Sequence, residues 1–241
     1  MPAPPAAPEP TIEACGEQAF LVRLGVRIDP AINARAQQLA ARVRRAAPGW
    51  LVDCVPSYAS VLIQFDLAAA APEVALAFVR QQLAATSEPT AGDDQPASAV
   101  HQVPVCYAPA HAPDLADVAA ARGLTVDEIV RRHAAGQYRV YQLGFRPGFP
   151  FLGAVDEAIA VPRLATPRAR VPGGAVGIAG RQTGIYPTAG PGGWRIIGRT
   201  PWRIFSPSAA RPFRLAAGDR VRFVPIGADE FARLQENDDA H

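Results

Sequence analysis

From about residue 137 onward, glycine and proline interrupt the chain every few residues, and this spacing constrains the fold more than any other feature of the sequence. They separate short apolar runs: YRVYQLGF, GAVGIAG, TGIYPT, WRIIGR, WRIFS and DRVRFVPI. Runs of this kind, bounded by turn residues, are typical of short β-strands. Many short strands with dense turn signals favour a closed β-barrel or a sandwich for this part of the chain.

The beginning of the chain has a different pattern, in which strands alternate with helices. Asp29 is a favourable N-cap for a helix that starts at Pro30 and that Pro48–Gly49 ends. A second amphipathic helix is expected from Pro72 to about Thr86. Four strands are expected within residues 11–25 (two strands), 50–56 and 59–66. The order strand–strand–helix, which occurs twice, predicts an α+β domain with an antiparallel sheet and its helices on one face.

Two segments are expected to lie outside the folded domains. The proline-rich start, MPAPPAAPEP, lacks both the basic residues and the apolar stretch of a signal peptide. The segment SEPTAGDDQPAS is polar, acidic and without periodicity, which is typical of a linker. The predicted organisation is a disordered tail (1–10), an α+β domain (11–86), a linker (87–98), a barrel domain (99–227) and a C-terminal helix and tail (228–241).

Two helices are expected at the start of the barrel domain, after a strand formed by HQVPVCY. Asp114 is the predicted N-cap of the first. Thr125 is the predicted N-cap of the second, where Glu128 three residues later completes a capping box. His133 falls at the end of this second helix, where a positive charge suits the helix dipole. Capping and catalysis are therefore both open roles for His133.

The charges of the barrel domain are strongly polarised. There is no acidic residue between Glu157 and Asp219, so this block carries a formal charge of +9 in a chain whose net charge is +2. Arginine binds planar anions through two parallel hydrogen bonds, so the block predicts an anion-binding face for a carboxylate, a phosphate or an acidic partner. The alternative is that the arginine stems cover barrel surface and pair with distant carboxylates. The nine residues are Arg163, Arg168, Arg170, Arg181, Arg195, Arg199, Arg203, Arg211 and Arg214.

The same block lacks the usual apparatus for proton transfer. It contains no Asp, Glu, His, Lys or Cys, and the whole chain contains no lysine. A Walker-type phosphate loop and a biotinylated lysine are therefore excluded within this chain. No metal is expected, because the histidines and the three cysteines lack metal-ligand spacing, and the cysteines are expected to be buried in a reducing compartment. The block can orient a substrate, whereas the acid–base groups have to come from the N-terminal part of the chain or from a second chain.

Two glycine-rich strings offer candidate walls of a binding cleft. Residues 144–153 read GFRPGFPFLG, and residues 190–195 read GPGGWR. The first cannot form a regular helix and predicts a rigid aromatic loop, which either plugs the core or borders a cleft. The second permits close approach of the backbone to a ligand.

Together with PRLATPRARVPGGAVGIAGRQTGIYPTAGPGGWRIIGRTP, these strings resemble the family that contains the B subunit of 5-oxoprolinase, the KipI sporulation-kinase inhibitor and allophanate hydrolase subunit 1. The resemblance covers most of residues 99–226. It implies an α+β N-terminal domain followed by an all-β cyclophilin-like barrel. One departure is the stretch Ala108–Ala112, which stands where family members usually have Gly-Gly-Glu-Phe-Gly.

The activity that the resemblance implies is the ATP-dependent opening of 5-oxo-L-proline to L-glutamate. The C subunit of 5-oxoprolinase is the expected direct partner, and its A subunit is a further one. ATP is expected to bind at the level of the complex, with no cofactor held by this chain alone. The alternatives are a KipI-like inhibitor of a sensor histidine kinase and a subunit of the allophanate hydrolase or urea carboxylase type. The protein is expected to be cytoplasmic, without a nucleic-acid or membrane partner.

The matching motif positions suggest where the small carboxylate substrate binds, although no catalytic residue is assigned. The expected substrate-binding residues are Arg168, Gln182, Thr183, Tyr186, Arg199 and Thr200. The expected cleft-loop residues are Phe145, Pro147, Phe149, Gly192, Gly193 and Trp194.

Overall fold

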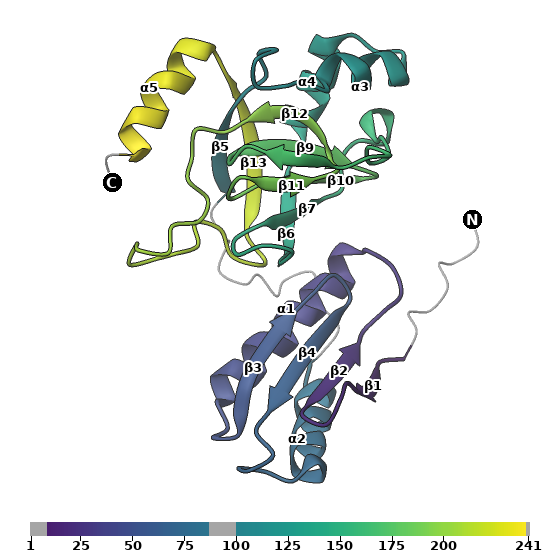
Figure 1. Ribbon diagram of the computed structural model, residues 1–241. Coiled ribbons are helices and arrows are strands. Elements are labelled where there is room, and N and C mark those ends of the chain that lie inside the picture. Colours follow the sequence, from purple (N-terminus) through teal and green to yellow (C-terminus); the bar gives the residue numbers. More distant parts are fainter. Residues whose placement is uncertain (1–8, 87–99, 240–241) are drawn as a thin grey trace, which may run out of the picture. The chain divides into compact units, whose positions relative to one another are not determined.

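A computed structural model of the chain describes residues 9–86 and 100–239 (Figure 1). The predicted linker, nearly all of the predicted N-terminal tail and the last two residues lie outside the described residues. The chain divides into two compact units, residues 1–97 and 98–241, and each is described by itself.

The first unit is an antiparallel sheet with the strand order β1-β2-β4-β3, packed against two helices (Figure 1). Alternate residues of the central strands, such as Val22 and Ile63, are fully buried and join the helices in one hydrophobic core. The Asp29 carboxylate accepts hydrogen bonds from the first backbone N–H groups of α1, as its residue type predicted. The elements are β1 (Thr11–Ala14), β2 (Ala19–Arg23), α1 (Pro30–Ala46), β3 (Leu51–Pro56), β4 (Ser60–Phe65) and α2 (Pro72–Ala84).

The second unit contains a closed barrel with the strand order β10-β7-β6-β13-β5-β12-β9, as far as the described residues show. The fold class expected from the sequence is therefore confirmed. Of the six apolar runs, WRIFS is the exception, because Phe205 makes only a single bridge, to Phe213. The strands are β5 (Val100–Cys106), β6 (Tyr138–Leu143), β7 (Pro150–Gly153), β9 (Ala175–Ala179), β10 (Gln182–Ile185), β12 (Arg195–Arg199) and β13 (Arg220–Ile226).

Further elements lie against the barrel (Figure 1). Two short strands, β8 (Arg168–Val171) and β11 (Gly190–Gly192), form a separate ribbon. Helix α3 (Leu115–Arg122) contacts both α4 (Val126–Ala135) and β12, and α4 contacts β13. Helix α5 (Ala228–Asp239) lies against β5.

The Asp114 carboxylate connects three of these elements. It accepts two hydrogen bonds from the Arg168 guanidinium, at 2.6 and 2.8 Å, and a third from the backbone N–H of Ile196 at 2.6 Å. The Asp114 side chain is only 3% exposed. Asp114 is the N-cap residue of α3, as predicted, but its side chain makes no capping bond to the helix, because the carboxylate binds β8 and β12 instead.

The predicted capping box of α4 forms only in part. The Thr125 hydroxyl accepts a hydrogen bond from the Glu128 N–H at 3.2 Å. The Glu128 carboxylate does not return to the cap, because Arg131 and Arg132 bind it, each at 2.7 Å. Charge-assisted bonds to two guanidinium groups are stronger than one bond to a neutral amide, which accounts for the difference.

His133 is buried in the core, which rules out the charged helix cap considered for it. Its ring is 0% exposed, stacks on Phe223, and lies 2.7 Å from the Tyr107 hydroxyl and 2.9 Å from that of Thr183. Thr183 uses its single proton to bind the Gly177 carbonyl, so it accepts from Nε2–H of His133, whose Nδ1 accepts from Tyr107. Burial lowers the pKa of His133 to about 3, so the ring is neutral.

This burial predicts a pH-dependent stability. The His133 pKa is lower in the folded chain than its ordinary value of 6.5, so the unfolded chain binds a proton first as the pH falls. Between about pH 6 and pH 4, the wild type should therefore lose about 1.4 kcal/mol more per pH unit than a His133→Gln variant. Urea unfolding at a series of pH values measures both slopes. Equal slopes would contradict the neutral, buried ring.

The Asp114–Arg168 pair predicts a second effect on stability. Asp114→Asn removes the charge that compensates Arg168 and should destabilise the barrel unit by about 3 kcal/mol. This value is near the low end of the range for breaking a buried ion pair, because the Arg168 side chain is 33% exposed. Asp117→Asn, an exposed site on the same helix, is the matched control and should have a much smaller effect. Denaturant unfolding measures both variants, and equal changes would show that the pair is not specifically stabilising.

Candidate ligand pocket

A small pocket of about 300 Å³ opens on the barrel unit between the two glycine-rich strings noted in the sequence. Its walls come from four parts of the chain: the loop before β7 with β7 itself, the segment before β8, the residue after β10, and β11 with the turn into β12. Its aromatic lining consists of Phe145, Phe149, Phe151, Tyr186 and Trp194.

Phe149 is the centre of this aromatic lining. Its ring meets those of Tyr186 and Trp194 edge to face, at centroid distances of 5.2 and 5.4 Å, and lies 4.7 Å from the ring of Phe151. Phe149, Tyr186 and Trp194 are each no more than 5% exposed. Edge-to-face packing of buried rings holds each ring in one orientation, so this wall of the pocket is preformed.

Two glycines allow the rings to pack this closely. A Cβ atom at Gly192 would lie 2.5 Å from the Tyr186 hydroxyl oxygen. A Cβ atom at Gly184 would lie 3.0 Å from both Phe149 and Trp194. The GPGGWR string therefore allows the close approach to its backbone that its glycines predicted, but the approaching group is the Tyr186 side chain of the protein itself.

Phe145 is the exposed part of the aromatic lining. Its backbone has φ 67°, a left-handed conformation that is unusual for a bulky residue, and it is 65% exposed. The next residue holds the loop in place, because the Arg146 guanidinium donates to the carbonyls of Ala189 and Pro191 at 3.0 and 3.4 Å. The Arg146 guanidinium also lies 5.3 Å from the centroid of the Phe145 ring.

The charge of the pocket comes from arginine. Arg163 is the one charged side chain among the described residues that line it, and these include no Asp, Glu, His, Lys or Cys. Burial raises the pKa of Tyr186, while the Trp194 N–H and the guanidinium groups of Arg163, Arg146 and Arg168 act in the opposite direction. The hydroxyl is thus protonated near neutral pH. The pocket suits a small anion with an uncharged body, and Tyr186 is the one side chain with an acidic proton besides Arg163 among its described lining residues.

The predicted cleft-loop residues mostly meet here. Phe145, Phe149, Gly192, Gly193 and Trp194 line the pocket, whereas Pro147 does not.

The predicted substrate-binding residues do not form one surface, and of these only Tyr186 lines the pocket. Thr183 and Thr200 are 0% and 2% exposed. Arg168 is bound to Asp114, and Arg199 donates to the Gly173 carbonyl at 2.9 Å. Gln182 pairs within β10 with its neighbouring strands. The expected shared carboxylate site of these six residues is therefore not assembled, because several of them serve the barrel itself.

The sequence did not distinguish Arg163 as a pocket residue. It belongs to the acid-free block, but the same sequence pattern applies equally to the eight other arginines of that block. The structure separates them: Arg168 pairs with Asp114, while Arg203, Arg211 and Arg214 lie at a different groove. The nine arginines therefore do not all line one pocket.

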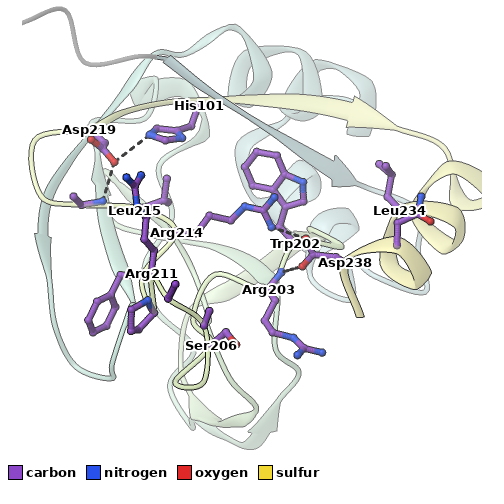
Figure 2. Close-up of a pocket in the computed structure, with 16 residues that line it drawn as sticks. His101, Trp202, Arg203, Ser206, Arg211, Arg214, Leu215, Asp219, Leu234 and Asp238 are labelled. Carbon is purple, nitrogen blue, oxygen red and sulfur yellow. Dashed lines mark hydrogen bonds and ion pairs between the residues drawn. The ribbon is translucent and has the colours of Figure 1, made fainter. Parts of the chain in front are cut away.

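That second groove, shown in Figure 2, is larger, about 1160 Å³, and lies between residues 202–219 and α5. Arg214 stacks on Trp202 at 4.0 Å and pairs with Asp238 at 2.6 Å. His101 and Asp219 lie 3.1 Å apart. Much of its charge is thus compensated internally, and none of the residues proposed from the sequence for substrate binding or the cleft lines it in the described structure. The smaller pocket is therefore the candidate site.

The described residues contain no cluster of three or more His, Cys, Asp or Glu side chains that could hold a metal ion. Cys54 and Cys106 are buried as expected, and burial raises the pKa of Cys54 to about 11. Cys15 is exposed, so the expectation that all three cysteines are buried is wrong for this residue, which follows the edge strand β1. Within residues 9–86 and 100–239, no helix has the length and apolar character of a membrane span.

Curated relatives are similar over much of the chain. The protein of Bacillus subtilis that is named as the B subunit of 5-oxoprolinase is 36% identical over 93% of this chain and 96% of its own length. Its namesake in Escherichia coli O157:H7 is 50% identical over 54% of this chain and 60% of its own length.

Solved structures show the same fold. The crystal structure of TTHA0988 matches 88% of this chain with a TM-score of 0.77 and 36% identity, and this chain spans 40% of that longer chain. The conserved uncharacterized protein PH0987 from Pyrococcus horikoshii is 43% identical over 92% of this chain and its own full length, with a TM-score of 0.54. The urea amidolyase of K. lactis, at 21% identity and a TM-score of 0.74, shares the fold over 97% of this chain and 16% of its own.

A family model agrees with these relatives. The model described as carboxyltransferase domain, subdomain C and D, matches residues 10–215. The chain therefore belongs to the carboxyltransferase subdomain C and D family, together with proteins named as the B subunit of 5-oxoprolinase.

Proposed function

We propose that this chain is the B subunit of an ATP-dependent 5-oxoprolinase, which acts with the A and C subunits to open 5-oxo-L-proline to L-glutamate. The relative from Bacillus subtilis that carries this name aligns along nearly the whole of both chains. The structural observation that carries the proposal is a preformed pocket with one arginine and no Asp, Glu, His, Lys or Cys among its described lining residues.

The chemistry explains why such a pocket needs a partner. In the overall reaction water adds to the ring amide carbon, the carbon–nitrogen bond breaks, and the nitrogen takes up a proton to leave an amine and a second carboxylate. These steps need a base, an acid and activation of a poor leaving group. The pocket residues can bind and orient the substrate, but the acid–base groups come from another chain in this proposal.

ATP is likewise assigned to the complex and not to this chain. The sequence contains no lysine and hence no Walker-type phosphate loop. The similarity to K. lactis urea amidolyase, at 21% identity, concerns the fold alone and does not indicate that the two proteins share a substrate.

Reconstitution tests the proposal. The purified chain alone, supplied with 5-oxo-L-proline and ATP, should release no glutamate, whereas the chain mixed with the A and C subunits of the same organism should release it in an ATP-dependent manner. Glutamate is measured directly, and co-purification reports whether the complex has assembled. Omitting this chain from the mixture is the control and should abolish turnover.

Two outcomes would overturn the proposal. Glutamate formation by this chain alone would refute the need for a partner. If a correctly assembled complex leaves 5-oxo-L-proline unchanged but hydrolyses allophanate, the substrate is allophanate and not 5-oxo-L-proline.

A further inference from the structure

We propose that Arg163 binds the carboxylate of a small substrate whose flat, uncharged body lies between the aromatic walls of the pocket. This inference rests on the proposed function for the identity of the substrate, 5-oxo-L-proline. The placement of the carboxylate and of the ring rests on the geometry of the pocket. Arg163 and Phe151 are not among the substrate-binding and cleft-loop residues expected from the sequence, although Arg163 belongs to the nine-arginine block.

The first argument is that the Arg163 side chain has no hydrogen-bond or ion-pair partner among the described residues, although it lines a pocket. Several other arginines of this unit are engaged: Arg168 by Asp114, Arg214 by Asp238, and Arg146 by backbone carbonyls. Arg170 and Arg195 resemble Arg163 in having no such partner among the described residues, but they do not line the pocket. A guanidinium that has no protein acceptor and lies beside an apolar pocket offers a forked pair of donors to a ligand carboxylate.

The second argument is the shape and chemistry of the remaining walls. A volume of about 300 Å³ is at the low end for small-molecule pockets, so it suits a compact ligand. The faces and edges of Phe149, Phe151 and Trp194 are apolar, which favours ring methylene groups over a second charge. Gly192 and Gly193 line the pocket with backbone and no side chain, which leaves room for a ligand beside the rings.

The third argument is the position of Phe145. It combines a left-handed backbone with a ring that is 65% exposed at a pocket-lining position. Both features disfavour a purely structural role, because an exposed ring contributes little to the core and the backbone conformation is costly for a bulky residue. We assign Phe145 to covering the bound ring.

The three arguments lead to separable roles. Arg163 recognises the carboxylate, so it should not affect the binding of a ligand that has none. Phe145 recognises the ring and should matter for both kinds of ligand. Two compounds distinguish these roles: 5-oxo-L-proline, and 2-pyrrolidinone, which has the same lactam ring without the carboxylate.

Binding of both compounds is measured by NMR titration of the purified full chain. Arg163→Gln should weaken the binding of 5-oxo-L-proline at least tenfold and leave the binding of 2-pyrrolidinone unchanged. Phe145→Ala should weaken the binding of both compounds. Arg170→Gln, which removes an exposed arginine that does not line the pocket, is the matched control and should behave as the wild type. Thermal unfolding checks that each variant is folded.

The reconstituted complex provides a second measurement that does not depend on affinity in the isolated chain. There, Arg163→Gln should raise the KM for 5-oxo-L-proline at least tenfold relative to the Arg170→Gln control. If the isolated chain binds neither compound and the KM of the Arg163→Gln complex equals that of the control, the inference is overturned.

The outcomes also separate this inference from the proposed function. An active complex in which Arg163→Gln changes neither binding nor KM would overturn the pocket assignment and leave the proposed function intact. An inactive complex whose isolated chain still binds 5-oxo-L-proline through Arg163 would sustain the carboxylate pocket and refute the reaction. An inactive complex without Arg163-dependent binding would overturn both.

Discussion

The candidate pocket depends on a single buried carboxylate outside it. Asp114 holds Arg168 at the start of β8 and the backbone of Ile196 in β12. Strand β8 pairs with β11, whose Gly192 packs against Tyr186, and β12 follows directly after Trp194. One carboxylate therefore positions two walls of the pocket. Because the Asp114 side chain is only 3% exposed, its hydrogen bonds are less screened by water than those of a surface carboxylate.

The same pairing explains how a block with nine arginines and no acid folds without strong self-repulsion. Its carboxylates come from flanking segments: Asp114 precedes the block, and Asp238 follows it in α5. Other guanidinium groups bind backbone carbonyls, as Arg199 binds Gly173. The positive charges that have such partners serve the structure, whereas Arg163 at the pocket is available to a ligand.

Local sequence patterns predicted much of the fold but less of the site. The Asp29 cap, the barrel strands and the aromatic loop around Phe149 follow from neighbouring residue types, and all are present. On equally local grounds, Asp114 was predicted to cap α3, and a helix cap was one of two roles considered for His133, but neither side chain caps a helix. Each is drawn away by distant partners: Asp114 binds an arginine 54 residues later, and His133 a threonine 50 residues later.

What the sequence by itself determined is the succession of an α+β unit and a strand-rich unit, the family, and the absence of lysine chemistry. Turn residues, periodicity and composition act over a few residues, so they can be read along the chain. Only the tertiary structure decided which arginine lines the pocket and which rings surround it. That choice depends on which carboxylates, carbonyls and glycines the closing barrel brings next to each side chain, and these partners are dispersed along the sequence.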